Sequence, residues 1–208
     1  MPLQNRVDPF GAIHADPARG LFTGNRGVIH DPATRTLLSR RWTTRAWIVC
    51  TLEHPLGRKR QPMGRNAPSG GAGWTELFFL DEVTALAAGH RPCFYCRRAA
   101  AEDFRRCFAA GNGLGHASAP AMDALLHRQR LASGGTPPLL APDEAEALPD
   151  GAMIAIDGQA YAIRGARALP WGFSRYGAAG PLPPGPVQLL TPPATVAALR
   201  AGYLPAWG

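Results

Sequence analysis

Four side chains in two short stretches of the chain have the chemistry of metal ligands. Cys93 and Cys96 lie in the segment ALAAGHRPCFYCRR, so two sulfurs can reach one ion from a single tight turn. Upstream, Cys50 and His54 form a C-x3-H pair. Three sulfurs and one imidazole suit tetrahedral zinc. We therefore expect one divalent ion to join the two segments.

Other residues offer weaker chemistry. His30 follows GNRGVI and can serve as a general base for phosphodiester hydrolysis, but an HDP sequence is also ordinary turn chemistry. His127 shares a short predicted helix with Asp123, Arg128 and Arg130, which is equally typical of a solvated helix face. His30 and His127 are therefore candidate catalytic residues, with structural roles as the alternative.

The composition indicates a globular protein with many turns. Of 208 residues, 46% are hydrophobic and 18% are charged, and there are 24 Gly and 21 Pro. No apolar run approaches the roughly 18 residues that cross a bilayer. The sequence MPLQNRVDPF has no apolar signal core, so we expect a cytoplasmic protein with no membrane contact. Cysteines in that compartment are usually reduced or bound to metal.

The positive charge is concentrated in the first third of the chain. Residues 1–65 hold eleven Arg and Lys residues and four acids, which accounts for the whole net charge of +7. This asymmetry indicates a nucleic-acid partner, DNA rather than RNA, although an arginine-rich composition is an alternative explanation. The candidate nucleic-acid-binding residues are Arg40, Arg41, Arg45, Arg58, Lys59 and Arg60.

The local patterns predict short elements that position these side chains. Residues 1–26 look irregular. Short strands are expected at 27–31, at 44–51 with its end near Cys50, and at 76–80. A helix is expected over 81–89, with Asp81 as N-cap and Gly89 after its end. A second helix over 92–110 would hold Cys93 and Cys96 in its first turn.

The remainder of the chain has one strong signal. Two alternating strands over 152–164 flank an Asp157-Gly158 turn, which predicts a hairpin. Helices are expected over 119–131 and 193–201 and a strand over 186–191. Residues 133–150 are rich in Pro and acids and look like a linker.

A family resemblance rests on the run FFLDEVTALAAGHRPCFYCRR, residues 78–98. It resembles the second half of the zinc module of Ada-type methylphosphotriester-repair proteins, in which a strand and a short helix lead to a similar RPC-x-x-C block. The first half of that module ends a strand on a C-x3-C pair, and Cys50 and His54 stand in the matching place. The resemblance covers about residues 45–98. The chain departs from the family in having His54 in place of Cys and a longer intervening segment.

The resemblance assigns four zinc ligands: Cys50, His54, Cys93 and Cys96. It also implies that Cys50 accepts a methyl group from a DNA phosphotriester. Replacing one thiolate by imidazole leaves a less anionic site with poorer sulfur nucleophiles, so we expect the zinc to be mainly structural. Cys107 and His90 are alternative ligands, for which we expect core and packing roles.

These patterns predict an α+β fold. A basic N-terminal part, residues 1–132, contains the zinc-stabilised mixed module of short strands and helices. A small C-terminal part, residues 150–208, carries the hairpin, and the two parts can share one core. The leading hypothesis is a zinc-binding protein that contacts nucleic acid through an Arg-rich surface. A nucleic-acid-modifying enzyme and a zinc-stapled protein-interaction domain are the alternatives.

Overall fold

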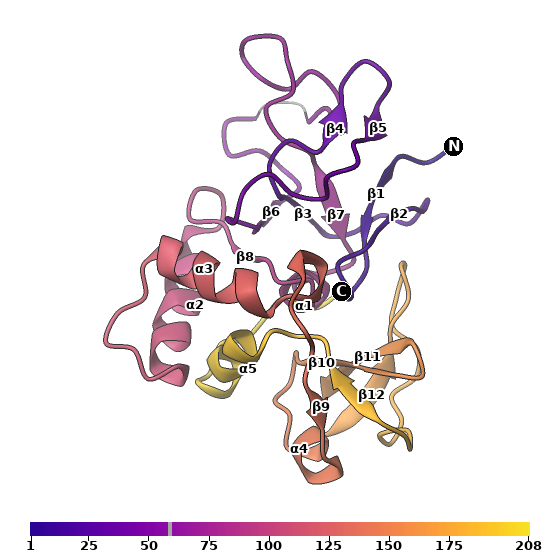
Figure 1. The fold of residues 1–208 in the computed structure, drawn as a ribbon, viewed down its shortest axis with the longest axis vertical. Helices are drawn as coiled ribbons and strands as arrows, with labels where there is room; N and C mark the ends of the chain where they lie inside the picture. The colour runs from indigo at the N-terminus through magenta and orange to yellow at the C-terminus, as the bar shows by residue number, and fades with distance from the viewer. Residues whose placement is uncertain (58–59) are drawn as a thin grey trace.

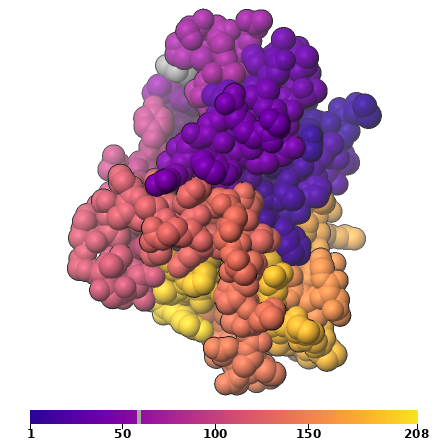
Figure 2. Space-filling view, viewed as in Figure 1, coloured from indigo at the N-terminus to yellow at the C-terminus, as the bar shows by residue number. Residues whose placement is uncertain are grey.

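The computed structural model describes residues 1–57 and 60–208. Within these ranges the chain forms five α-helices and three β-sheets (Figure 1), which confirms the predicted α+β class. In Figure 1 the first sheet lies in the upper part of the molecule and the second in the lower part, and helix α1 between them contacts a strand of each. Figure 2 shows one continuous body, in which the first third of the chain (indigo to purple) lies mainly in the upper part and the last third (salmon to yellow) mainly in the lower part. None of the helices in the described ranges combines the length and the apolar character that a membrane span requires.

The first sheet has six short strands in the order β2-β1-β7-β3-β6-β8. Their bounds are β1 Gln4–Val7, β2 Ile13–Ala15, β3 Phe22–Asn25, β6 Ile48–Thr51, β7 Leu77–Phe79 and β8 Arg91–Pro92. The β1–β7 and β6–β8 pairs are parallel and the others antiparallel. The expectation that residues 1–26 are irregular is therefore wrong. Strands β4 (His30–Asp31) and β5 (Thr36–Leu37) form a separate two-stranded sheet.

Close backbone packing holds β3 against β6. A Cβ atom added at Gly24 would lie 2.1 Å from the carbonyl oxygen of Ile48, so only glycine fits at this position. This contact fixes β6, the strand that carries Cys50, between β3 and the edge strand β8.

Helix α1 (Glu82–Ala87) begins and ends where the sequence predicts. The Asp81 carboxylate accepts a hydrogen bond from the Thr84 N–H at 2.8 Å, as an N-cap should, and Gly89 follows the helix with φ +79°. Helix α3 (Ala119–Gln129) is capped by Ser118 and is followed by the 3-10 turn η1 (Leu131–Ser133).

Helix α2 (Arg98–Gly111) starts six residues later than predicted. Arg91 and Pro92 form strand β8, and residues 93–97 make a turn before the helix begins. The prediction that Cys93 and Cys96 occupy the first helical turn is therefore wrong. The missing Pro N–H is compatible with a two-residue edge strand as well as with a helix start, and pairing with β6 decided between them.

The second sheet is antiparallel throughout, in the order β12-β11-β10-β13-β9. Its strands are β9 Leu139–Leu140, β10 Met153–Ile156, β11 Gln159–Arg164, β12 Arg167–Pro170 and β13 Val187–Leu189. Asp157 and Gly158 both have positive φ, 48° and 79°, as a type I′ hairpin turn requires, so the predicted hairpin is confirmed. The segment 133–150, where we expect a linker, contains β9 and the short helix α4 (Pro142–Glu146).

One apolar cluster joins elements from both predicted parts of the chain. Phe104 and Phe108 of α2 and Met122 of α3 pack in the same cluster as Ile154 of β10 and Leu199 of helix α5 (Pro193–Arg200). All five are buried. The two parts therefore share a core and do not form separate hydrophobic units.

Buried polar groups connect the first sheet to the C-terminal segment. Arg97 donates two hydrogen bonds to Glu82, at 2.7 and 2.8 Å, and the Tyr203 hydroxyl donates a third to the same carboxylate at 2.6 Å. Because Arg97 follows Cys96 directly, this buried ion pair fixes the start of α2.

A second polar cluster surrounds Trp47. The guanidinium carbons of Arg26 and Arg130 lie 4.0 and 3.9 Å from the Trp47 ring. Burial lowers the pKa of both arginines to about 9. The sequence patterns did not reveal these two buried cations, because single arginines in a basic segment look like surface residues.

Candidate metal centre

The fold brings three of the four predicted metal ligands together. The sulfur atoms of Cys50, Cys93 and Cys96 all lie within 4.8 Å of one another. Cys50 and Cys93 are buried and Cys96 is partly exposed. Three sulfurs at this spacing can bind one ion such as zinc.

The parallel pairing of β6 with β8 explains why Cys50 and Cys93 meet. Val49 is the register partner of Pro92, and the Cys93 N–H donates to the Val49 carbonyl oxygen at 3.0 Å. Cys50 follows Val49 within β6, and Cys93 directly follows Pro92 at the end of β8, so the two cysteines lie side by side. Strand β8 is itself held by Arg91, which makes two hydrogen bonds of 2.8 Å to Asp123 of α3.

The turn after β8 brings Cys96 back toward Cys93. The Arg97 N–H donates to the Cys93 carbonyl oxygen at 2.9 Å, which closes the turn. The Tyr95 N–H donates to the Cys93 sulfur at 3.4 Å. A backbone donor of this kind stabilises a thiolate.

The three thiols are electrostatically coupled. Hydrogen bonds from Cys50 and Cys96 lower the pKa of Cys93 far below its usual value. The pKa of Cys50 is raised, first by its hydrogen bond to Cys93. The group therefore favours a single thiolate, which accepts hydrogen bonds from the other two thiols. A bound divalent cation would displace the protons of those two thiols.

His54 lies beside this group but not in it. Its Nδ1 atom accepts a hydrogen bond from the Leu56 N–H at 3.1 Å, and its ring centroid is 6.2 Å from that of Tyr95. No His54 nitrogen belongs to the set of ligand atoms within 4.8 Å. Its assignment as a ligand stays a prediction.

A cavity of about 190 Å³ opens next to the sulfurs. Its lining includes all three cysteines together with His54, Arg60, Trp74 and Glu76. A second hollow of about 340 Å³ shares these last four residues and extends toward Arg65 and Asn66. Sequence analysis did not assign Trp74 or Glu76 to the site, because Trp74 precedes the predicted strand 76–80, Glu76 begins it, and neither belongs to a recognisable motif.

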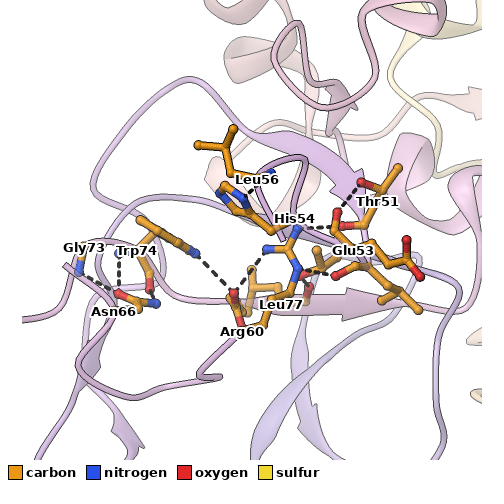
Figure 3. A network of polar contacts seen from close by, with 12 residues as sticks. Thr51, Glu53, His54, Leu56, Arg60, Asn66, Gly73, Trp74 and Leu77 are labelled. Atoms are coloured by element: carbon orange, nitrogen blue, oxygen red, sulfur yellow. Dashed lines mark hydrogen bonds and ion pairs between the residues drawn. The ribbon is translucent and has the colours of Figure 1, made fainter. Parts of the chain in front are cut away.

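Arg60 is part of the cavity wall. Its guanidinium donates to Glu76 Oε1 at 3.2 Å and to the Thr51 carbonyl oxygen at 2.7 Å, and it also donates to the Leu52 carbonyl oxygen (Figure 3). Figure 3 shows the His54 ring beside this guanidinium. Arg60 is therefore held within the site by these bonds, and its predicted contact with nucleic acid stays a prediction.

The other candidate nucleic-acid-binding residues divide into two groups. Arg40, Arg41 and Arg45 are exposed. Arg58 and Lys59 lie outside the described residues. Contact of any of them with nucleic acid stays a prediction.

The structure does not bring the two candidate catalytic histidines together. His30 is 2% exposed, with Nδ1 2.6 Å from the Thr75 hydroxyl and Nε2 3.1 Å from the Gly64 carbonyl oxygen. Thr75 also accepts from the Ile29 N–H, so its hydroxyl proton is free to bond His30 Nδ1. Both ring nitrogens are thus occupied, which is the geometry of a structural histidine.

His127 contacts a different set of residues. Its Nδ1 lies 3.2 Å from an Arg130 nitrogen, and its ring packs edge-on against Trp42. Partial burial, followed by the charges of Arg130 and Arg45, lowers its pKa. Hydrolysis by His30 and His127 stays a prediction that this arrangement does not favour.

The alternative ligands have packing roles. His90 is fully buried between Trp47 and Phe79, with ring centroids 5.2 and 4.7 Å away. Cys107 is fully buried in the apolar cluster of α2. Neither belongs to the sulfur group.

Comparisons with protein-family models, with curated proteins and with solved structures gave no match to this chain. The Ada-type resemblance, including methyl acceptance by Cys50, therefore stays an expectation based on the motif.

Proposed function

We propose that the protein binds one zinc ion through the thiolates of Cys50, Cys93 and Cys96, and that this ion stabilises the first sheet. The single observation that carries the proposal is the convergence of three sulfurs within 4.8 Å from residues far apart in the sequence. The proposal does not depend on His54.

The donor set favours zinc over other abundant cations. Thiolates are soft ligands that select zinc, copper(I) or iron–sulfur clusters, whereas magnesium and calcium prefer oxygen. A tetrahedral centre can be built on three sulfurs with one further ligand.

The ion would act as a cross-link. Strand β6 is joined to β8 by two register pairs, and to the turn that follows β8 by the bond from the Cys93 N–H to the Val49 carbonyl oxygen. A metal bound to both would add a connection that the unfolded chain lacks, so binding free energy becomes folding free energy.

Metal analysis of the purified protein tests this proposal. We expect about one zinc per chain in the wild type, and loss of that zinc in Cys93→Ser. Cys107→Ser, which changes a buried thiol outside the group, is the matched control and should keep its zinc. Wild-type protein that remains metal-free after refolding with excess zinc would contradict the proposal.

Charge distribution favours nucleic-acid contact as a second function. The whole net charge lies in residues 1–65, and Arg40, Arg41 and Arg45 are exposed there. Contacts with phosphates release counterions, so binding to a fluorescent DNA duplex should weaken steeply as salt rises. The triple alanine variant of these arginines should bind more weakly, whereas Arg175→Ala, an exposed arginine in the C-terminal part, should not. Equal binding by both variants would exclude this surface.

A further inference from the structure

The three cysteines of the proposed metal centre line a cavity. Three sulfurs occupy at most three corners of a tetrahedron, so one corner needs another ligand. The position of that corner decides whether the metal is closed to small molecules or open to them.

The hydrogen bond between the Leu56 N–H and His54 Nδ1 disfavours His54 as a metal ligand in this structure. Since Nδ1 accepts a hydrogen bond from the Leu56 N–H, its lone pair is already engaged. In the neutral ring the proton then sits on Nε2, which has no lone pair left for a metal. Coordination by either nitrogen would require the Leu56 hydrogen bond to break.

Space for an external ligand exists beside the sulfurs. The cavity of about 190 Å³ is lined by Cys50, Cys93 and Cys96. One water molecule occupies about 30 Å³ of liquid, so the cavity has room for a small organic ligand. Ile48, Pro55 and Tyr95 contribute apolar lining, which favours such a ligand over a chain of waters.

Glu76 is one of the residues that line the same cavity, and one of its two buried carboxylate oxygens has no partner within residues 1–57 and 60–208. The residue is 1% exposed. Its Oε1 accepts from Arg60 and from the Trp74 indole N–H at 3.4 Å, but Oε2 has no hydrogen-bond partner among the described residues. A buried carboxylate oxygen without a donor is costly, so a ligand carrying an N–H or O–H group would be stabilised there.

The charge of the site selects a neutral ligand. Zinc with three thiolates carries a net charge of −1, and Glu76 is already paired with Arg60. A further anion would add like charge in a partly buried place, whereas a neutral donor would not.

We propose that the metal centre has an exchangeable fourth position in this cavity, taken by water at rest and by a small neutral Lewis base with an N–H or O–H group that donates to Glu76. Imidazole-like and amide-like molecules have this chemistry. The inference rests on the proposed zinc site and adds that the site is open.

Cobalt substitution with imidazole as the probe tests the inference. Protein refolded with Co²⁺ is first assayed for one cobalt per chain, and failure at this step overturns the metal site itself. With cobalt bound, its visible absorption bands are followed during titration with imidazole. We expect a saturable shift of the bands in the wild type, and a similar shift in His54→Ala. A spectrum that does not respond in the wild type but responds in His54→Ala would overturn the open position and identify His54 as the ligand.

Glu76→Gln tests the hydrogen-bond acceptor. This variant keeps the size of the side chain, and a cobalt spectrum equal to that of the wild type before imidazole is added shows that the site is intact. We expect its imidazole affinity to fall about tenfold, because a hydrogen bond to a charged acceptor is lost. Glu53→Gln, an exposed acid of the same segment, is the control and should leave the affinity unchanged. An unchanged affinity in Glu76→Gln would remove Glu76 from the proposal, and if this variant does not fold the wild-type and His54→Ala titrations still decide the open position.

Discussion

The two larger sheets are built in different ways. In the first sheet, strands that pair are often far apart in sequence, as in the parallel partners Arg6 and Phe78, or Val49 and Pro92. In the second sheet, β10, β11 and β12 follow one another as antiparallel neighbours joined by short turns. The first sheet therefore depends on contacts that close long loops, and the second on local ones.

The interiors differ as well. Around the first sheet lie buried polar side chains, including Arg26, Glu76 and His90, each with an atom that has no partner among the described residues. The second sheet packs Ile154, Ile163 and Leu189 in an apolar cluster. The first sheet has its own smaller apolar cluster, and the proposed metal would add a further connection to it.

Metal removal should give the largest effect. At a free zinc concentration roughly a thousand times Kd, binding stabilises the folded state by about 4 kcal/mol. Chelation should then lower the melting temperature by roughly 10 °C for a chain of this size. Amide exchange, followed by mass spectrometry, should increase in β6 and β8 more than in β10 and β11. Equal increases in both sheets would abolish the distinction between them.

Ile154→Ala should destabilise the second sheet and leave the metal site of the first sheet intact. The side chain is fully buried on β10, and its removal leaves a cavity that should lower the free energy of unfolding by about 3 kcal/mol. Denaturant titration measures this loss. Zinc content should stay at the wild-type value, because Ile154 lies in the other sheet, and a variant that also loses its metal would show that the two regions are not independent.

Tyr203→Phe tests the link between the regions. It removes the hydrogen bond to Glu82, a buried charged acceptor, and should lower the free energy of unfolding by about 2 kcal/mol. The Tyr161→Phe control should have a smaller effect, since the Tyr161 hydroxyl makes no hydrogen bond among the described residues. Similar losses in both variants would argue against a special role for the Glu82 contact.

Gly158→Ala should have the smallest effect. Nothing lies within 4 Å of the added Cβ, so only the positive φ of 79° opposes the change, at about 1 kcal/mol. Denaturant titration should show this small loss with unchanged zinc content. A loss as large as that in Ile154→Ala would mean that the hairpin controls more of the fold than its local pairing indicates.

The same contrast explains which features could be predicted from the sequence. The Asp157-Gly158 hairpin and the Asp81 cap are confirmed because their signals lie within a few residues. Strands β1 and β3 were missed because QNRV and FTGN have neither alternation nor high β-propensity. They are strands only because distant partners pair with them.

In the candidate site too, the features with local sequence signals were predicted and those set by distant pairing were not. The Cys93 and Cys96 spacing is local, and the sequence indicated it together with Cys50. Glu76 was not recognised because its importance comes from its position beside the cysteines, which the β7 pairing sets and no local pattern encodes. The predicted start of α2 was wrong because pairing with β6, rather than helix propensity, determines the conformation of Arg91 and Pro92.

The parallel register of β6 with β8 has a consequence for synthesis on the ribosome. Cys50 emerges from the exit tunnel well before Cys93 and Cys96, so the ion cannot be captured by the complete sulfur set until the later turn is translated. During that interval the first thiol has no partner from its own site and is open to oxidation or to stray metals. Cells short of zinc should therefore accumulate nascent chains in which Cys50 is exposed to these reactions.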